Sequence, residues 1–223
     1  MILRPGLYSH AIMIRKIASI ASVLAISPFL AAMSAHAADV PTVVVQQVEA
    51  RLDNQHELQP PIIDANPVMP GAWVYFTDNL TKRPGQRGEN RPYTLDAHLI
   101  YQDADQAWHD QLFDRYEEDG GIPKIASVFF AHADQTPRSK SLIVLVQTPQ
   151  QHDDYGGDSY DGYVYRLTGS AAQGAVFVGL QNDASAPFIG QCQCGFRDGH
   201  TEHARYPNAD AIRRALAQTY PLK

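Results

Sequence analysis

The second half of the chain alternates between short runs rich in β-branched and aromatic residues and polar segments that contain Gly, Pro or Asp. Such runs, bounded by turn residues, are typical of β-strands joined by tight turns. The pattern predicts about six consecutive strands, paired as three hairpins in one antiparallel meander sheet. The expected strands are 125–133, 141–148, 160–167, 175–180, 186–196 and 201–206.

Two segments outside these strands have apolar residues at helical spacing. Residues 103–121 combine a candidate Asp cap, an apolar stripe and a terminal Gly-Gly pair, which predicts a mid-chain helix. Residues 208–220 place Ile212, Leu216 and Tyr220 on one stripe, which predicts a C-terminal helix packed on one face of the sheet. Strands grouped between helices indicate the α+β class.

The chain between the N-terminal segment and residue 103 is less regular. Residues 41–55 favour a helix over a strand, because their apolar residues recur at helical spacing. Four prolines in residues 57–71 predict a surface connector. Residues 72–78 predict a strand, and residues 79–93 predict a polar loop marked by Gly and Pro.

The first 37 residues have the order of a secretory signal peptide. Arg15 and Lys16 precede an apolar run, and Ala35-His36-Ala37 provides small residues before a cleavage point. Met13 is an alternative start, because residues 1–12 precede this pattern. We therefore expect cleavage near Ala37, a single α+β domain over residues 38–223, and a periplasmic or secreted protein whose mature chain does not insert into a membrane.

Removal of the leader makes the chain more acidic. The leader contains three basic and no acidic residues, so the 18 basic residues fall to 15 against 24 acidic ones, a net charge of −9 with His neutral. This balance disfavours binding to nucleic acid or anionic membranes and suits a basic partner. Two cysteines are too few for a disulfide scaffold, so the fold must depend on apolar burial.

No motif in the chain identifies an enzyme. It has no phosphate-binding loop, no dinucleotide fingerprint, no H-E-x-x-H and no G-x-S-x-G elbow. Ser159 follows Gly-Asp, but the 64 residues after it are too few for the α/β domain that such a serine would begin. The sequence therefore favours a non-catalytic protein.

Both cysteines lie in the stretch "CQCGFRDGHTEH", which begins at Cys192. Its Asp-Gly pair is a strong signal for a two-residue hairpin turn. That register places Cys192, Cys194 and His203 on one face of the hairpin and His200 on the other. His200 could then serve as a fourth metal ligand only if the turn were looser.

Three states of the cysteine pair are open. An oxidised pair suits an export compartment, although side chains at i and i+2 of a strand lie ~6.6 Å apart and a disulfide needs Cβ atoms within ~4.5 Å. Two buried thiols packed under the last helix form the second alternative. The third is a zinc or copper site made by Cys192, Cys194 and His203.

A segment rich in Tyr and Asp precedes the cysteines. Tyrosines beside acids on a rigid sheet suit protein recognition, and packing across the hairpin is the alternative. Tyr160 and Tyr163 should fall on opposite faces of a strand, whereas Tyr163 and Tyr165 share one. The candidate binding residues are Asp154, Tyr155, Asp158, Tyr160, Asp161 and Tyr163.

These features together predict an exported, non-catalytic protein-binding module of the inhibitor or immunity type. Its expected partner is another protein that is basic or part of the cell envelope. The binding module itself is expected to require no cofactor. The alternative is a metal- or redox-responsive envelope protein that uses Cys192, Cys194 and His203. An enzyme of unrecognised type would have to use Asp198 and His200 together with Glu202.

Overall fold

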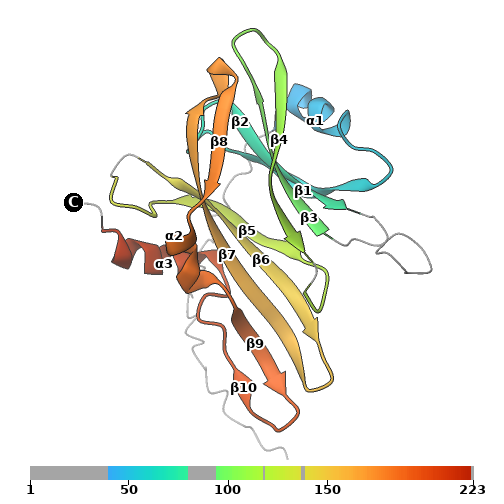
Figure 1. Ribbon diagram of the computed structural model, residues 1–223, viewed down its shortest axis with the longest axis vertical. Coiled ribbons are helices and arrows are strands. Elements are labelled where there is room, and N and C mark those ends of the chain that lie inside the picture. Colours follow the sequence, from blue (N-terminus) through green and yellow to red (C-terminus); the bar gives the residue numbers. More distant parts are fainter. Residues whose placement is uncertain (1–39, 80–93, 118, 137–138, 222–223) are drawn as a thin grey trace, which may run out of the picture. The chain divides into compact units, whose positions relative to one another are not determined.

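The computed structural model describes residues 40–79, 94–117, 119–136 and 139–221, which belong to the compact unit Ala37–Lys223 (Figure 1). The predicted export signal and nearly all of the predicted loop 79–93 lie outside the described residues. The described residues form ten strands in two antiparallel sheets, together with three short α-helices. The α+β class is confirmed in this broad sense, whereas the prediction of one six-stranded meander is wrong.

The first sheet consists of four antiparallel strands paired in sequence order. They are β1 (His56–Asp64), β2 (Ala72–Asn79), β3 (Thr94–Gln102) and β4 (Trp108–Glu117). Helix α1 (Thr42–Glu49) covers one face of this sheet, because Val44 and Val48 pack against Trp73, Tyr75 and Ile100. The helix expected within residues 41–55 and the strand expected at residues 72–78 are both present.

The second sheet has the order β10-β9-β7-β6-β5, with β8 also paired to β7. Its strands are β5 (Lys124–Ala131), β6 (Ser141–Gln151), β7 (Tyr155–Ser170), β8 (Ala175–Leu180), β9 (Gln191–Phe196) and β10 (Thr201–Glu202). The three predicted hairpins, β5–β6, β7–β8 and β9–β10, are confirmed. The strands do not follow one another as a meander, because β7 is 16 residues long and pairs with β9 along Tyr155–Tyr160 and with β8 along Tyr165–Ser170.

Helix α3 (Ala209–Thr219) is the predicted C-terminal helix. The side chain of Asn208 caps it by accepting a hydrogen bond from the Ala211 N–H at 3.0 Å. Ile212 and Leu216 belong to the same buried cluster as Ile143 and Leu145 of β6, so α3 covers one face of the second sheet. The chain between β7 and β9 contains three short helices, η1 (Ala171–Gln173), α2 (Asn182–Ser185) and η2 (Ala186–Phe188).

The main core lies between the two sheets. Alternate residues of β6 face opposite ways, so that Leu142 and Val144 pack with Val74 and Phe76 of β2, whereas Ile143 points toward α3. Tyr165 adds a polar link across this core, because its hydroxyl donates to the Asp114 carboxylate of β4 and lies 2.9 Å from the Tyr116 hydroxyl. Burial is the main reason that the pKa of Tyr165 and that of Tyr116 are raised.

The mid-chain helix predicted at residues 103–121 is wrong, because its apolar part is strand β4. A bulge explains the helical spacing: Ala97 pairs with Asp114 and His98 pairs with Leu112, which leaves Phe113 as an extra residue between them. Phe113 and Tyr116 therefore both pack against the inter-sheet core, although they are three residues apart. Pairing along β3 stabilises the strand against a helical preference in the local sequence.

The surface connector predicted at residues 57–71 is also wrong over most of its length. Residues 57–64 belong to β1, which is an edge strand and so tolerates prolines that cannot donate to a ladder. The ladder with β2 is interrupted between Gln59 and Ile63, where Pro60 and Pro61 stand.

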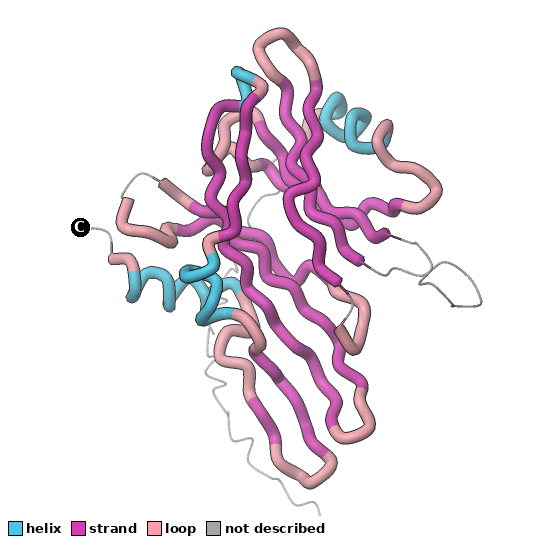
Figure 2. Tube along the Cα trace, in the orientation of Figure 1, coloured by secondary structure: helices cyan, strands magenta, loops and turns pink. Residues whose placement is uncertain are grey.

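Figure 2 shows that strands dominate the described chain and that its helices are short. Among the described residues, no helix is both long and apolar enough to cross a lipid bilayer.

Candidate functional site

The two regions that the sequence singles out separately lie on neighbouring strands. Tyr155 pairs with Phe196 and Ser159 pairs with Cys192, so the Tyr/Asp-rich start of β7 runs beside the cysteine-bearing β9 (Figure 1). Strand β5 stops pairing with β6 at Gln147. The sheet continues beyond that point as an extension made of β6, β7, β9 and β10, which we define as residues 148–160 and 191–202.

Four rings stack in sequence across the end of the extension. The ring centroids are 4.4 Å apart between His152 and Tyr155, 5.3 Å between Tyr155 and Phe196, and 3.9 Å between Phe196 and His200. His152 and His200 are exposed, and Tyr155 and Phe196 are partly buried. This aromatic row joins the β6–β7 hairpin to the β9–β10 hairpin through ring stacking.

The two hairpin turns also contact each other through the backbone. The Arg197 N–H donates to the Asp154 carbonyl oxygen at 2.8 Å. An open hollow of about 400 Å³ lies at this junction, lined by Asp154, Phe196, Arg197 and Asp198. The turns therefore form one continuous surface.

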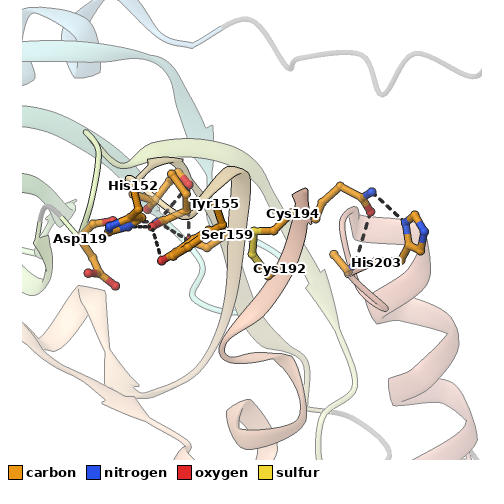
Figure 3. The surroundings of a disulfide bond; sticks show 11 residues. Asp119, His152, Tyr155, Ser159, Cys192, Cys194 and His203 are labelled. Atoms are coloured by element: carbon orange, nitrogen blue, oxygen red, sulfur yellow. Dashed lines mark hydrogen bonds between the residues drawn. A yellow bond between two sulfur atoms is a disulfide. The ribbon is translucent and has the colours of Figure 1, made fainter. Parts of the chain in front are cut away.

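Gln150 holds the aromatic row from the inner side of β6. Its side-chain amide donates to the Asp119 carbonyl oxygen at 2.7 Å and to the Ser159 hydroxyl at 3.2 Å, and its amide oxygen lies 2.9 Å from Nε2 of His152 (Figure 3). Gln150 is only 7% exposed. Gly120 lies against these side chains, because a Cβ at that position would be 2.6 Å from the Gln150 amide oxygen.

Cys192 and Cys194 form a disulfide beside this network (Figure 3). Their Cα atoms are 5.3 Å apart, compared with ~6.6 Å for an i, i+2 pair in a regular strand. Gly157 of β7 pairs with Cys194 and has φ +147°. A Cβ on Gly157 would lie 2.2 Å from the Gln193 carbonyl oxygen. The glycine thus allows β7 to approach β9 closely at the disulfide.

The predicted hairpin register is wrong by one residue. Thr201 pairs with Gly195 and Glu202 pairs with Cys194, because the turn contains three residues and Gly199 adopts φ +93°. A shift of one residue exchanges the two faces of a strand. His203 therefore lies 2.9 Å from the Gln193 side chain and does not join the cysteines.

The structure does not assemble the proposed metal ligands. His200 lies 2.7 Å from the Asp198 carboxylate, away from the disulfide. No three His, Cys, Asp or Glu side chains converge as a metal site requires within the part of the chain that the structure describes. The zinc or copper alternative remains a prediction.

The residues considered for catalysis are exposed to solvent. His200 and Asp198 are close together, but their side chains are 52% and 70% exposed at a hairpin turn. Glu202 is also exposed and belongs to β10. Hydrogen bonds from the His200 backbone and side chain lower the pKa of Asp198, which is typical of a turn that is closed by its own carboxylate.

The predicted binding residues divide into two groups. Asp154, Tyr155 and Asp158 lie in the extension near its turn. Tyr160 packs toward α3 and Tyr163 toward the inter-sheet core, which confirms that they fall on opposite faces. Burial raises the pKa of Tyr163 to about 12.

Asp161 has a structural contact of its own. Its carboxylate accepts a hydrogen bond from the Gly190 N–H at 2.6 Å, and burial raises its pKa. This contact joins β7 to the turn that precedes β9. The binding roles proposed for Tyr160, Asp161 and Tyr163 remain predictions.

Three residues of the site were not anticipated from the sequence, namely Gln150, His152 and Phe196. Phe196 stands next to the turn signal, and His152 begins the Tyr/Asp-rich segment, so both were close to regions already singled out. Nothing in the sequence marks Gln150, because its role depends on contacts with Asp119 and Ser159, which come from other strands and loops.

The extension is strongly acidic. Residues 148–160 and 191–202 contain five acidic side chains and one basic side chain, a net charge of −4 with His neutral. The acidic residues are Asp153, Asp154, Asp158, Asp198 and Glu202.

Comparison with known protein families, with curated proteins and with solved structures finds no match for this chain. The geometry and charge of the extension therefore provide the evidence on function.

Proposed function

We propose that this protein is an exported, non-catalytic binding module of the inhibitor or immunity type, and that it docks a basic protein partner on the end of its second sheet. The observation that carries the proposal is the aromatic row, which crosses two hairpins and is surrounded by acidic residues. Rigid aromatic side chains provide contact area at little cost in conformational entropy, and they dominate the energy of many protein interfaces.

The charge of the extension supports a partner rich in Lys and Arg. The aromatic row stacks Tyr155 and Phe196 between His152 and His200, within a region of net charge −4. A cationic side chain placed there gains from the carboxylates, and its aliphatic part can pack against the aromatic row. Carboxylates at the rim also accelerate the association of a basic partner at low salt.

The test is capture of partners from the envelope extract of the source cells by immobilised mature protein. Phe196→Ala should weaken binding of the captured basic protein by about thirtyfold or more, as expected for a central aromatic contact. Phe177→Ala provides the matched control, because Phe177 is 69% exposed on β8, which pairs with the opposite end of β7. Melting curves check that both variants fold.

A pair of charge variants separates the acidic contribution from the aromatic one. Asp153→Asn with Asp154→Asn should reduce the association rate and its dependence on salt. Asp105→Asn with Asp183→Asn removes the same charge from exposed positions outside the extension and should leave binding unchanged. The proposal is wrong if the partner binds Phe196→Ala and Phe177→Ala equally well, or if no basic protein is captured.

A further inference from the structure

The Cys192–Cys194 disulfide closes a loop that contains a single residue, Gln193. A crosslink over so short a loop removes little conformational freedom from the unfolded chain, so global stabilisation does not account well for it. The chain contains no cysteines other than these two. The role of the disulfide is therefore local to β9.

The two sulfur-bearing residues differ in their access to solvent. Cys194 is 3% exposed and lies under Gly157, where a Cβ would be 2.9 Å from the Cys194 Cα atom. Cys192 is partly exposed. Strand β10 ends at Glu202, opposite Cys194, so its pairing with β9 stops before Cys192. A reagent from solvent therefore reaches Cys192 first.

The chain two residues before Cys192 is uncrowded. Gly190 carries no side chain, and a Cβ built on it would meet no atom within 4 Å. The neighbouring Asp161 carboxylate is held by the Gly190 N–H.

We propose that the Cys192–Cys194 pair is a thiol–disulfide exchange site that accepts two electrons from a dithiol-bearing peptide or protein. The first substrate thiol loses its proton to solvent, and its thiolate attacks Sγ of Cys192. A substrate–Cys192 disulfide forms, the Cys192–Cys194 bond breaks, and its electron pair remains on Sγ of Cys194, which takes up a proton.

The second substrate thiol completes the reaction. As a thiolate, it attacks the substrate sulfur of the mixed disulfide and forms the substrate's own disulfide, and Cys192 leaves as a thiolate and is protonated. The substrate dithiol is thereby oxidised, and the cysteine pair is reduced to two thiols. Cys194 acts from its buried position as the leaving group of the first step. This reaction does not require the proposed docking of a basic partner.

The first experiment uses the wild-type mature protein and a single thiol, glutathione, as the probe. The folded oxidised protein is incubated with glutathione, quenched with acid and fragmented in a mass spectrometer to locate the mixed disulfide. We expect the adduct on Cys192 in about tenfold excess over Cys194, because access decides which sulfur is attacked. Adducts shared equally by the two sulfurs, or formed only after denaturant is added, would overturn the proposal.

The second experiment uses dithiothreitol as a dithiol probe and matched variants. The wild-type protein should yield one oxidised dithiothreitol and two free protein thiols per chain in the folded state. After reaction with oxidised glutathione, folded Cys194→Ser should acquire its adduct about tenfold faster than folded Cys192→Ser, and denaturant should abolish that difference. Equal rates in the folded variants would contradict the assignment of Cys192 as the attacked residue.

Discussion

Gly157→Ala is the substitution that most directly tests how the extension is held together. Gly157 adopts φ +147°, a conformation that residues with a side chain rarely adopt, and it lies opposite Cys194. The Cβ of an alanine would lie 2.2 Å from the Gln193 carbonyl oxygen, about 1.2 Å short of an ordinary contact at 3.4 Å. The Gln193 oxygen belongs to the backbone and the position of a Cβ is fixed by its own backbone, so β9 has to move away from β7.

The expected cost follows from two contributions. The φ angle contributes roughly 1–3 kcal/mol of backbone strain, and the loss of one ladder hydrogen bond contributes about 1 kcal/mol. We therefore expect the free energy of unfolding to fall by about 2–4 kcal/mol. For a domain of this size, that corresponds to a fall in melting temperature of roughly 4–16 °C.

Gly156→Ala is the matched control, because a Cβ on Gly156 would meet only the Gln150 carbonyl oxygen at 3.6 Å. Urea unfolding gives the free energies, and hydrogen exchange of the β9 amides reports whether the two strands separate. Only Gly157→Ala should destabilise the protein by this amount and increase exchange in β9. If the two variants unfold at the same urea concentration with the same exchange pattern, the close approach at the disulfide is not a feature of the protein.

Three further changes have outcomes that the structure specifies. Tyr165→Phe should lower the free energy of unfolding by about 1.5–3 kcal/mol in urea titrations, because it removes a buried hydrogen bond to a carboxylate. In the Tyr165→Phe variant, the further change Tyr116→Phe should lower the free energy of unfolding by less than it does in the wild-type protein, since the two hydroxyls are hydrogen-bond partners. Asp161→Asn should raise the melting temperature at neutral pH. Burial raises the pKa of the Asp161 carboxyl in the folded chain, so ionisation of this carboxyl lowers the stability of the wild-type protein above that pKa. The difference in melting temperature between the variant and the wild type should vanish below pH ~3.9, where the carboxyl is protonated in both the folded and the unfolded chain.

The strands that sequence reasoning predicted best are those whose own residues supply the signal. The sequence predicts strand β8 at residues 175–180, where it is found, because a turn with Gly174 at φ +66° precedes a compact apolar run. Helix α3 has both a cap and an apolar stripe. In such segments the local preference and the tertiary packing agree.

The segments that were predicted wrongly depend on partners that are distant in the sequence. Strand β4 shows helical spacing only because of the bulge opposite Ala97 and His98 in β3. Strand β1 tolerates Pro60 and Pro61 only because it lies at the edge of its sheet. Neither the bulge nor the edge position can be read from the segment alone, so the sequence does not predict the division into two sheets.

The candidate site shows the same limit. The Tyr/Asp-rich segment and the cysteine stretch were each recognised from composition, but their pairing requires β8 to leave the edge of β7 at Tyr165. The length of β7 makes this arrangement possible. The turn register was missed because an Asp-Gly pair also suits a three-residue turn with glycine at positive φ.

The shared strand β9 connects the two proposals physically. Phe196 of the aromatic row is two residues from Cys194, so both lie on the same face of one strand. Reduction removes the constraint that holds the two Cα atoms 5.3 Å apart, whereas a regular strand would place them ~6.6 Å apart. A change toward the regular spacing would shift Phe196 relative to Tyr155. If the partner binds the two states with different affinities, thermodynamic linkage requires that it shift the equilibrium between disulfide and dithiol by the same factor.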